Sequence, residues 1–135
     1  MREPALVNLN FFKENNDTCG HHVGDLALKH LARVLQRETR LQDTVARFGG
    51  DEFAVLVRDI EFDDAKRLAI RIGHTASANP VYRDKHGNAA HISLCLGVVA
   101  LAHYTDPDST LIAADRELYA AKALAHADRE ARQAA

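Results

Sequence analysis

Cysteine, clustered basic residues and long apolar runs are all scarce in this sequence. The two cysteines, Cys19 and Cys95, lie far apart in unlike surroundings, so we expect free thiols rather than a disulfide or a metal site. The formal net charge is -2 and no basic block occurs, which argues against nucleic acid as a partner. No apolar run approaches the roughly 20 residues of a membrane span, and no charged-then-apolar leader opens the chain. These absences favour a cytoplasmic protein without direct membrane contact, or the cytoplasmic part of a membrane-anchored parent.

The remaining composition is that of an ordinary globular domain. Of the 135 residues, 47% are hydrophobic and 27% are charged, which is sufficient for one buried core. Neither an internal repeat nor a linker is visible. We therefore expect a single domain over residues 1–135.

A Gly-Gly-Asp-Glu tetrapeptide at 49–52 lies between two short apolar runs, 44–48 and 53–57. Paired glycines between such runs predict a β-hairpin, because tight hairpin turns need a positive φ that glycine adopts without strain. The tip then presents Asp51 and Glu52 on a tightly turned backbone that leaves room for a large ligand. Carboxylates placed in this way suit a hard cation that carries a phosphate. A surface hairpin with solvated acids has the same local pattern, so this stretch alone leaves both interpretations open.

Hydrophobic periodicity predicts the other elements. Strands are expected at 5–10, 81–82 and 91–99, and helices at 11–14, 21–37, 62–78 and from 106–109 into a polar, Ala-rich tail. Gly97 inside the last strand predicts a bulge or a close backbone contact. Because a hairpin interrupts an otherwise alternating order, we expect an α/β (α+β) fold with a single mixed central sheet of about five strands, flanked by helices.

Gly-Gly-Asp-Glu-Phe at 49–53 resembles the signature of GGDEF domains, the diguanylate cyclase family. That family carries an upstream pattern D-x-D-x-F-K-x-x-N-D-x-x-G-H-x-x-G-D. The chain matches it at Phe12, Lys13, Asn16, Asp17, Gly20, His21, Gly24 and Asp25. Residues 114–122 match the C-terminal pattern A-D-x-x-L/M-Y-x-A-K as well. The resemblance covers nearly the whole chain and implies a sheet like that of nucleotide cyclases and polymerase palms.

The resemblance also implies an activity. Two subunits of a homodimer each bind one GTP, and each 3′-hydroxyl attacks the α-phosphate of the other GTP, which gives cyclic di-GMP and pyrophosphate. Two Mg²⁺ (or Mn²⁺) ions per GTP would activate the attacking oxygen and offset the phosphate charge. The family places catalysis at the hairpin tip, which here consists of Gly49, Gly50, Asp51 and Glu52.

Further roles follow position by position. The metal would be held by Asp51, by Asn8, which is an aspartate in the family, and by the backbone of Leu9. Asn16 and Asp25 would read the guanine edge, since an amide and a carboxylate complement its acceptor and donors. Phosphate contacts would come from Lys13, Lys122 and the backbone N–H groups of Phe11 and Phe12 at a helix start.

Simpler roles stand beside these. Asn16 and Asp17 could cap the following helix, Asp25 could be a solvated acid, and Lys122 could be an ordinary surface lysine. His21 and His22 are adjacent, and adjacent helical side chains point about 100° apart, so a joint metal site is disfavoured.

Two departures weaken the catalytic expectation. Both acids of the D-x-D pattern are amides here, Asn8 and Asn10, and a neutral amide holds Mg²⁺ more weakly than a carboxylate. The family's phosphate-binding arginine after Lys122 corresponds to His126, which is largely neutral at pH 7. We therefore expect impaired catalysis.

A regulatory motif is also present. Arg40-Leu41-Gln42-Asp43 matches the R-x-x-D motif that binds cyclic di-GMP in the family, although an ordinary surface ion pair would look the same. The chain further lacks the helical segment with an L-T-x-L-x-N-R motif that usually precedes the first strand. Two hypotheses result: an impaired cyclase, or an inactive module that binds GTP or cyclic di-GMP and regulates an attached sensory or phosphodiesterase (EAL) domain.

Overall fold

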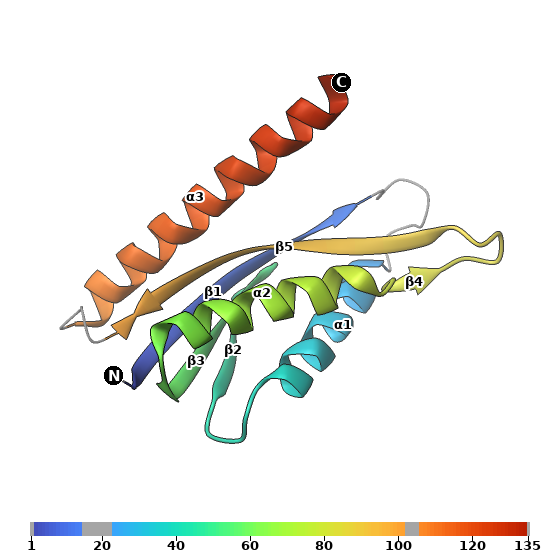
Figure 1. Cartoon of the computed structure of the whole chain (residues 1–135). Helices are drawn as coiled ribbons and strands as arrows, with labels where there is room; N and C mark the ends of the chain where they lie inside the picture. Colours follow the sequence, from blue (N-terminus) through green and yellow to red (C-terminus); the bar gives the residue numbers. More distant parts are fainter. Residues whose placement is uncertain (1, 15–22, 102–105, 135) are drawn as a thin grey trace.

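The structure, a computed structural model, describes residues 2–14, 23–101 and 106–134, with side chains described over 2–11, 24–101 and 106–120. Its elements, in chain order, are β1 (Glu3–Glu14), α1 (Val23–Glu38), β2 (Thr44–Gly49), β3 (Glu52–Ile60), α2 (Phe62–Ala78), β4 (Tyr82–Arg83), β5 (Ala89–Ala100) and α3 (Pro107–Ala134). Figure 1 shows α1 and α2 on one side of the sheet and α3 on the other.

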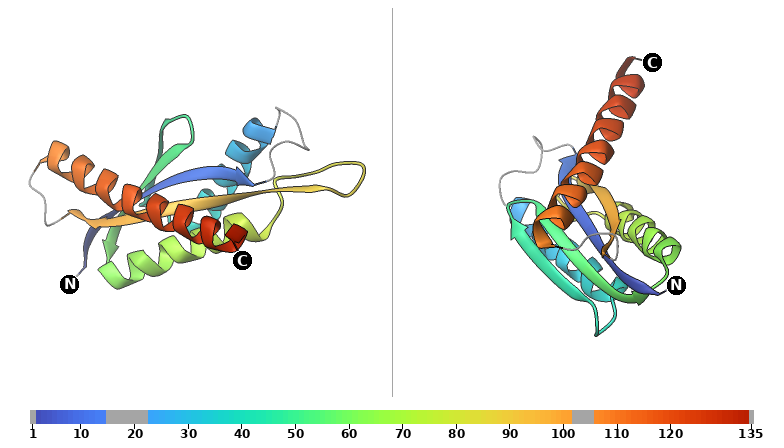
Figure 2. Two further views of the ribbon diagram at one scale, coloured as in Figure 1. Left: turned by 90° about the horizontal axis from the view of Figure 1, so that it is seen from above. Right: turned by 90° about the vertical axis from the view of Figure 1, so that its left-hand side faces the viewer.

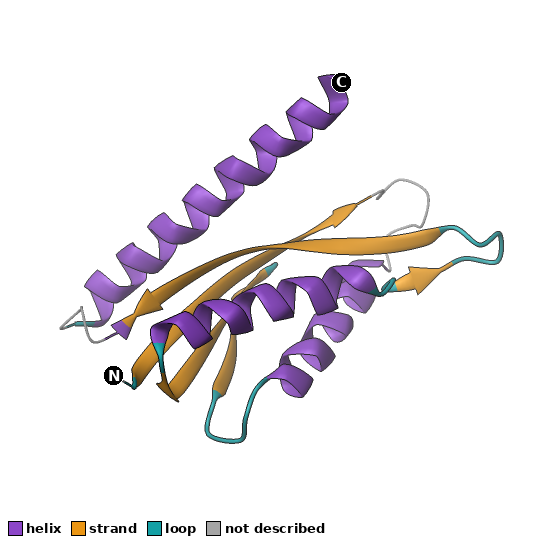
Figure 3. Ribbon diagram, in the orientation of Figure 1, coloured by secondary structure: helices purple, strands orange, loops and turns teal. Residues whose placement is uncertain are grey.

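The strands, drawn in orange in Figure 3, form one sheet in the order β2-β3-β1-β5-β4. Five strands were expected, but every described pair is antiparallel, so the expectation of a mixed sheet was wrong. The reason lies in the connection through α2. After this helix the short β4 turns back into β5, and it is β5 that runs in the same direction as β3. The central strand β1, however, lies between β3 and β5, and it is antiparallel to both of them.

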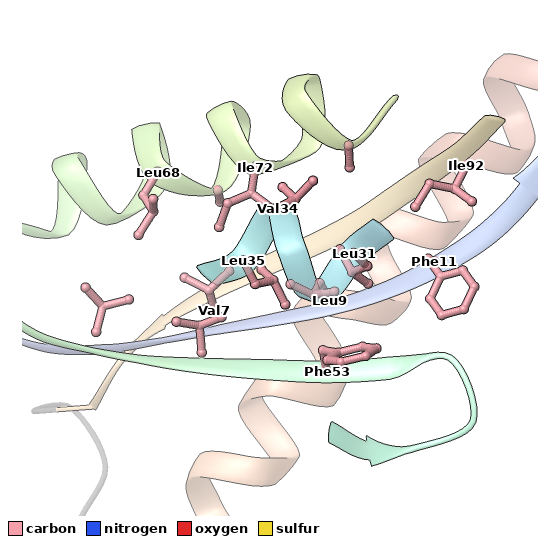
Figure 4. Close-up of a cluster of buried hydrophobic side chains, with 14 of the residues drawn as sticks. Val7, Leu9, Phe11, Leu31, Val34, Leu35, Phe53, Leu68, Ile72 and Ile92 are labelled. Carbon is pink, nitrogen blue, oxygen red and sulfur yellow. The ribbon is translucent and has the colours of Figure 1, made fainter. Parts of the chain in front are cut away.

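The main core lies between the sheet and the helices α1 and α2 (Figure 4). Alternate residues of β1 face this layer, and Val7 and Leu9 are fully buried. Leu31 and Leu35 of α1, four residues apart, and Ile72 of α2 close over them. Period-2 burial in the strand and period-4 burial in the helix are what the sequence pattern predicted.

α3 covers part of the opposite face. Asp106 caps its first turn, because its carboxylate accepts hydrogen bonds from Ser109 N and Ser109 Oγ, both at 2.8 Å. Pro107 takes the first helical position, where a missing N–H costs nothing. The helix packs against β5 where Gly97 lies, and towards its C-terminal end it runs away from the sheet (Figure 2).

Two expectations about secondary structure need correction. Residues 11–14 were expected to start a helix, yet they continue β1, because Phe11–Glu14 pair with Leu94–His91 of β5. The Ala-rich tail was expected to follow the last helix, whereas it is part of α3 down to Ala134. Among the described residues, no helix is both long enough and apolar enough to cross a membrane.

Candidate functional site: the hairpin tip and the adjoining face of β1

The β2–β3 hairpin forms the turn that the glycine pair predicted. Gly49 has a φ of 137° and Gly50 a φ of 51°, both in the region that favours glycine. A Cβ at either position would meet nothing within 4 Å, so backbone conformation rather than crowding requires glycine here. Arg47 fastens the turn, because its Nε and Nη2 donate to the Gly50 carbonyl at 3.2 and 2.8 Å. Asp51 is therefore presented, exposed, on a defined turn.

Strand register places three polar side chains of the site on one face of the sheet. Asn10 lies opposite Glu52 of β3, and Asn8 lies opposite Ala54, two residues further along each strand. Cross-strand partners project to the same face, and residues two apart on a strand share a face. Asn8, Asn10 and Glu52 therefore lie on the α3 side of the sheet, away from the main core.

β1 and the hairpin tip are joined at Asp51 by two hydrogen bonds. The side-chain amide of Asn10 donates from Nδ2 to Asp51 Oδ1 at 2.9 Å. The next residue of β1, Phe11, donates its backbone N–H to the Asp51 carbonyl at 3.1 Å. The tip is thus held by both the side chain and the backbone of β1.

Asn8 is buried and its acceptor atom lacks a partner. Its exposed fraction is 2%, and Oδ1 accepts no hydrogen bond within the described residues. The burial follows from Gly97, the β5 partner of Asn8, because the missing side chain lets α3 approach the sheet at Glu117 and Leu118. An unsatisfied buried oxygen costs roughly 1–3 kcal/mol and favours a donor or cation beside it.

These residues can be compared with the needs of a divalent cation. In the part of the chain that the structure describes, no three His, Cys, Asp or Glu side chains gather into a metal cluster. Oxygen donors are nevertheless present: the carboxylate of Asp51, the orphaned Oδ1 of Asn8 and the carboxylate of Glu52 on the same face. Mg²⁺ is commonly held by one or two carboxylates together with substrate phosphates. The donor set therefore fits a weakly held cation that shares a nucleotide.

The remaining predicted substrate residues are only partly described. Asp25 lies in the first turn of α1 and is exposed. Asn16 lies outside the described residues, and the side chains of Lys13 and Lys122 do too. The helix start expected at Phe11 and Phe12 was wrong, because both residues lie in β1, and the Phe11 N–H already donates to the Asp51 carbonyl. For the backbone of Phe12, a phosphate contact stays a prediction.

Arg40 and Asp43 form a connected pair at the other end of the hairpin. Asp43 Oδ2 accepts the Arg40 backbone N–H at 2.8 Å, and Oδ1 accepts Arg58 N at 3.3 Å and Arg40 Nη2 at 3.3 Å. Arg40 Nη2 also donates to the Arg58 carbonyl. Burial alone would raise the pKa of the Asp43 carboxyl, but the hydrogen bonds from Arg40 and Arg58 and the Arg40 charge together hold that pKa below its ordinary value.

A groove with a volume of about 330 Å³ lies beside this pair. Its arginines are Arg2, Arg40, Arg67 and Arg71. All four have acidic partners: Arg71 Nε lies 2.5 Å from Glu38 Oε2, Arg67 Nη1 2.6 Å from Asp64 Oδ1, Arg40 Nη2 3.3 Å from Asp43 Oδ1 and Arg2 Nη1 3.8 Å from Asp59 Oδ2. The groove thus offers guanidinium donors, which suit an anion with planar hydrogen-bonding groups, but each of these donors already pairs with an acid of the lining.

Sequence reasoning missed several residues of these sites, and two of them show why. Arg47 lies two positions before Gly49, the first residue of the signature, but nothing in its spacing shows that its guanidinium turns back to Gly50. Arg71 joins the groove across 31 positions from Arg40, and only the packing of α2 beside the hairpin brings them together. In the sequence, Arg71 is simply one charge on the polar side of a helix.

Comparison with known proteins agrees with this arrangement. The family described as "Diguanylate cyclase, GGDEF domain" matches residues 5–127. The response regulator PleD of Caulobacter vibrioides is 38% identical over 120 residues, which cover 87% of this chain and 26% of that protein. Diguanylate cyclase TpbB of Pseudomonas aeruginosa is 38% identical over 126 residues, covering 92% of this chain and 28% of that protein.

Solved structures give the same result. The GGDEF domain of TpbB from Pseudomonas aeruginosa superposes with a TM-score of 0.75 at 33% identity, over 90% of this chain and 73% of that one. The active GGEEF domain of a diguanylate cyclase from Vibrio cholerae reaches a TM-score of 0.74 at 28% identity, over 89% and 77%. The chain belongs to the GGDEF domain family of diguanylate cyclases, the proteins of cyclic di-GMP signalling. It spans about a quarter of the length of the curated relatives named above.

Proposed function

We propose that this chain is the GGDEF domain of a larger cyclic di-GMP signalling protein, and that it binds GTP and condenses it to cyclic di-GMP slowly. The observation that carries the proposal is the hairpin tip, which keeps Asp51 and Glu52 while β1 offers amides, Asn8 and Asn10, where the family has acids. The tip and fold support nucleotide chemistry of the family type. The lost negative charge supports a reduced rate.

The residues divide the work as follows. Asp25 on α1 and Asn16 recognise guanine, and Lys13 and Lys122 contact the phosphates as point charges. Asp51, Asn8 Oδ1 and the Leu9 backbone would hold Mg²⁺ or Mn²⁺. When bound, the metal would make the 3′-hydroxyl more nucleophilic and offset charge at the α-phosphate. Because each GTP is both nucleophile and electrophile, two copies of the domain must face each other, so we propose a homodimer as the catalytic state.

The number of metal ions is the weak point of this site. The expectation of two ions per GTP assumes the acids of the D-x-D pattern. With neutral Asn8 and Asn10, each ion would be bound through fewer charges, and a larger share of the binding would fall on the nucleotide phosphates. Turnover should therefore need high metal concentrations.

A second candidate function is a regulatory module that binds cyclic di-GMP without making it. The observation that favours it is the arginine-lined groove beside Arg40 and Asp43. Arg presents a planar fork that suits phosphate and the guanine Hoogsteen edge. In this role the domain would report product concentration to an attached sensory or EAL domain.

One experiment distinguishes these functions. The purified domain is incubated with GTP and Mg²⁺ or Mn²⁺, and cyclic di-GMP is detected by mass, with calorimetric titrations of GTP and cyclic di-GMP alongside. The matched control is Asp51→Asn, which keeps the size of the side chain and removes its charge. Product that disappears in the control supports the cyclase. Binding without product supports the regulatory module, and the absence of both would refute the two functions together.

A further inference from the structure

The contact between Asn10 and Asp51 joins two parts of the site that are 41 positions apart in sequence. Asn10 is 8% exposed, whereas Asp51 lies in the exposed turn. A neutral amide donor and a carboxylate acceptor are complementary, and hydrogen bonds to charged acceptors are among the stronger ones in proteins. The bond therefore anchors the hairpin tip to β1, the central strand of the sheet.

The chemical identity of residue 10 decides whether such an anchor is possible without a metal. An aspartate at this position would set a second negative charge against Asp51, and two adjacent carboxylates repel unless a cation lies between them. Asn10 has nearly the same shape but supplies a donor. In this chain the side chain of residue 10 can therefore attract the tip in the absence of any ion.

The groups around Asn10 and Asp51 support the same conclusion. Asn8, the next residue of β1 on that face, is also neutral, so the strand adds no repulsion to the tip. The Phe11 backbone bond to the Asp51 carbonyl forms only while the tip is docked. A cation that takes the place of the Asn10 amide on Asp51 Oδ1 breaks this anchor, so the anchor competes with metal binding at that lone pair.

We infer that Asn10 is a positioning residue that docks the GGDEF tip onto β1 in the metal-free protein. Its amide replaces the cation that two carboxylates at positions 10 and 51 would need between them. The tip is then ordered without Mg²⁺, and Mg²⁺ adds little order. This inference concerns the metal-free state and holds whether or not the domain makes cyclic di-GMP, so its failure and that of the proposed function are separately visible.

Hydrogen exchange at the tip tests the inference directly. Exchange of the Phe11 amide and of residues 49–53 is measured in EDTA and in excess Mg²⁺ or Mn²⁺, for the wild type, Asn10→Asp and Asn10→Ala. The wild type should exchange at the same rate in both conditions. Asn10→Asp should exchange about tenfold faster in EDTA and recover with metal, and Asn10→Ala should exchange faster in both conditions.

Two further variants make the test specific. Asn79→Asp introduces the same charge at the exposed C-terminal end of α2, so it should leave tip exchange unchanged. Asp51→Ala removes the acceptor from an exposed turn and should speed exchange at Phe11 even if the buried Asn10 variants do not fold. The inference is overturned if Asn10→Ala or Asp51→Ala exchanges like the wild type, or if metal slows wild-type tip exchange severalfold.

Discussion

Gly97 and Glu117 are in such close contact that a Cβ at Gly97 would lie 2.6 Å from Glu117 Cβ, and 3.1 Å from the Glu117 carbonyl carbon. Backbone as well as side chain is in the way, so Gly97→Ala must push α3 off the sheet. We expect the free energy of unfolding to fall by about 1–3 kcal/mol, measured by urea denaturation. Gly73→Ala is the matched control, because its Cβ meets only the Leu96 Cδ1 methyl at 3.3 Å in a helix that favours alanine. Equal losses in both variants would contradict this account of Gly97.

Restoring the acid in β1 should change both stability and activity. Asn8→Asp places a carboxylate in a position that is 2% exposed, so in EDTA the variant should lose about 1–3 kcal/mol of unfolding free energy. Mg²⁺ or Mn²⁺ should restore stability and raise cyclic di-GMP production, measured by thermal unfolding and by mass. Asn8→Ala is the control, since it removes the orphaned oxygen without adding charge and should not respond to metal. If Asn8→Asp binds metal and makes no more product, His126 becomes the next position to test.

Asp43 is expected to be structural as well as regulatory. Its side chain is 1% exposed and accepts from the backbone N–H groups of both Arg40 and Arg58. Asp43→Ala leaves these donors without their acceptor, so the free energy of unfolding should fall by about 1–3 kcal/mol. Asp64→Ala, which breaks only an exposed ion pair, should cost less than about 1 kcal/mol in the same denaturation experiment. A reversed order of these two losses would refute the structural role.

The Asp43 contribution should depend on pH in one direction. Because its folded pKa is lower than its unfolded pKa, its stabilisation is complete above the unfolded pKa of about 4 and is lost as the pH falls through the folded pKa. The difference in unfolding free energy between the wild type and Asp43→Ala should therefore shrink at acid pH. Urea unfolding at intervals from pH 6 downward measures this difference. A gap that stays constant would show that the charge of Asp43 is not involved.

Product binding should depend on the guanidinium of Arg40. Arg40→Ala removes the planar donor fork from the groove, and we expect cyclic di-GMP affinity to fall at least about tenfold in a calorimetric titration. Arg83→Ala removes an exposed arginine that does not line this groove, and it should leave the affinity unchanged. If the two variants bind equally well, cyclic di-GMP is not held at this groove.

The sequence predicted those features that depend on local chemistry. Period-2 and period-4 patterns gave the hairpin and α1, and the bounds expected for α2 agree with Phe62–Ala78. The close contact expected at Gly97 is also confirmed. The prediction of a helix at 11–14 was wrong because those residues pair with β5. That partner lies about 80 positions away, and local propensity does not depend on it.

Relations across the chain were harder to predict. The identity of Asn10 suggested a lost acid, but its donation to Asp51 depends on strand register and on the turn. Asn8 is buried only because α3 packs on Gly97, so its burial depends on β1, β5 and α3, three segments that are distant in sequence. Family patterns named the positions of the site, and the structure supplied the contacts among those that it describes.

The exposure of β2 has a consequence for the handling of the protein. This strand is exposed at every residue, Val45 and Phe48 are 38% and 56% exposed, and within the described residues no strand pairs with its outer edge. An open edge with apolar side chains is a template for strand pairing between molecules. Arg47 lies between those two residues, and its charge therefore opposes such pairing in addition to fastening the turn. At high concentration, a variant without Arg47 should aggregate before the wild type does.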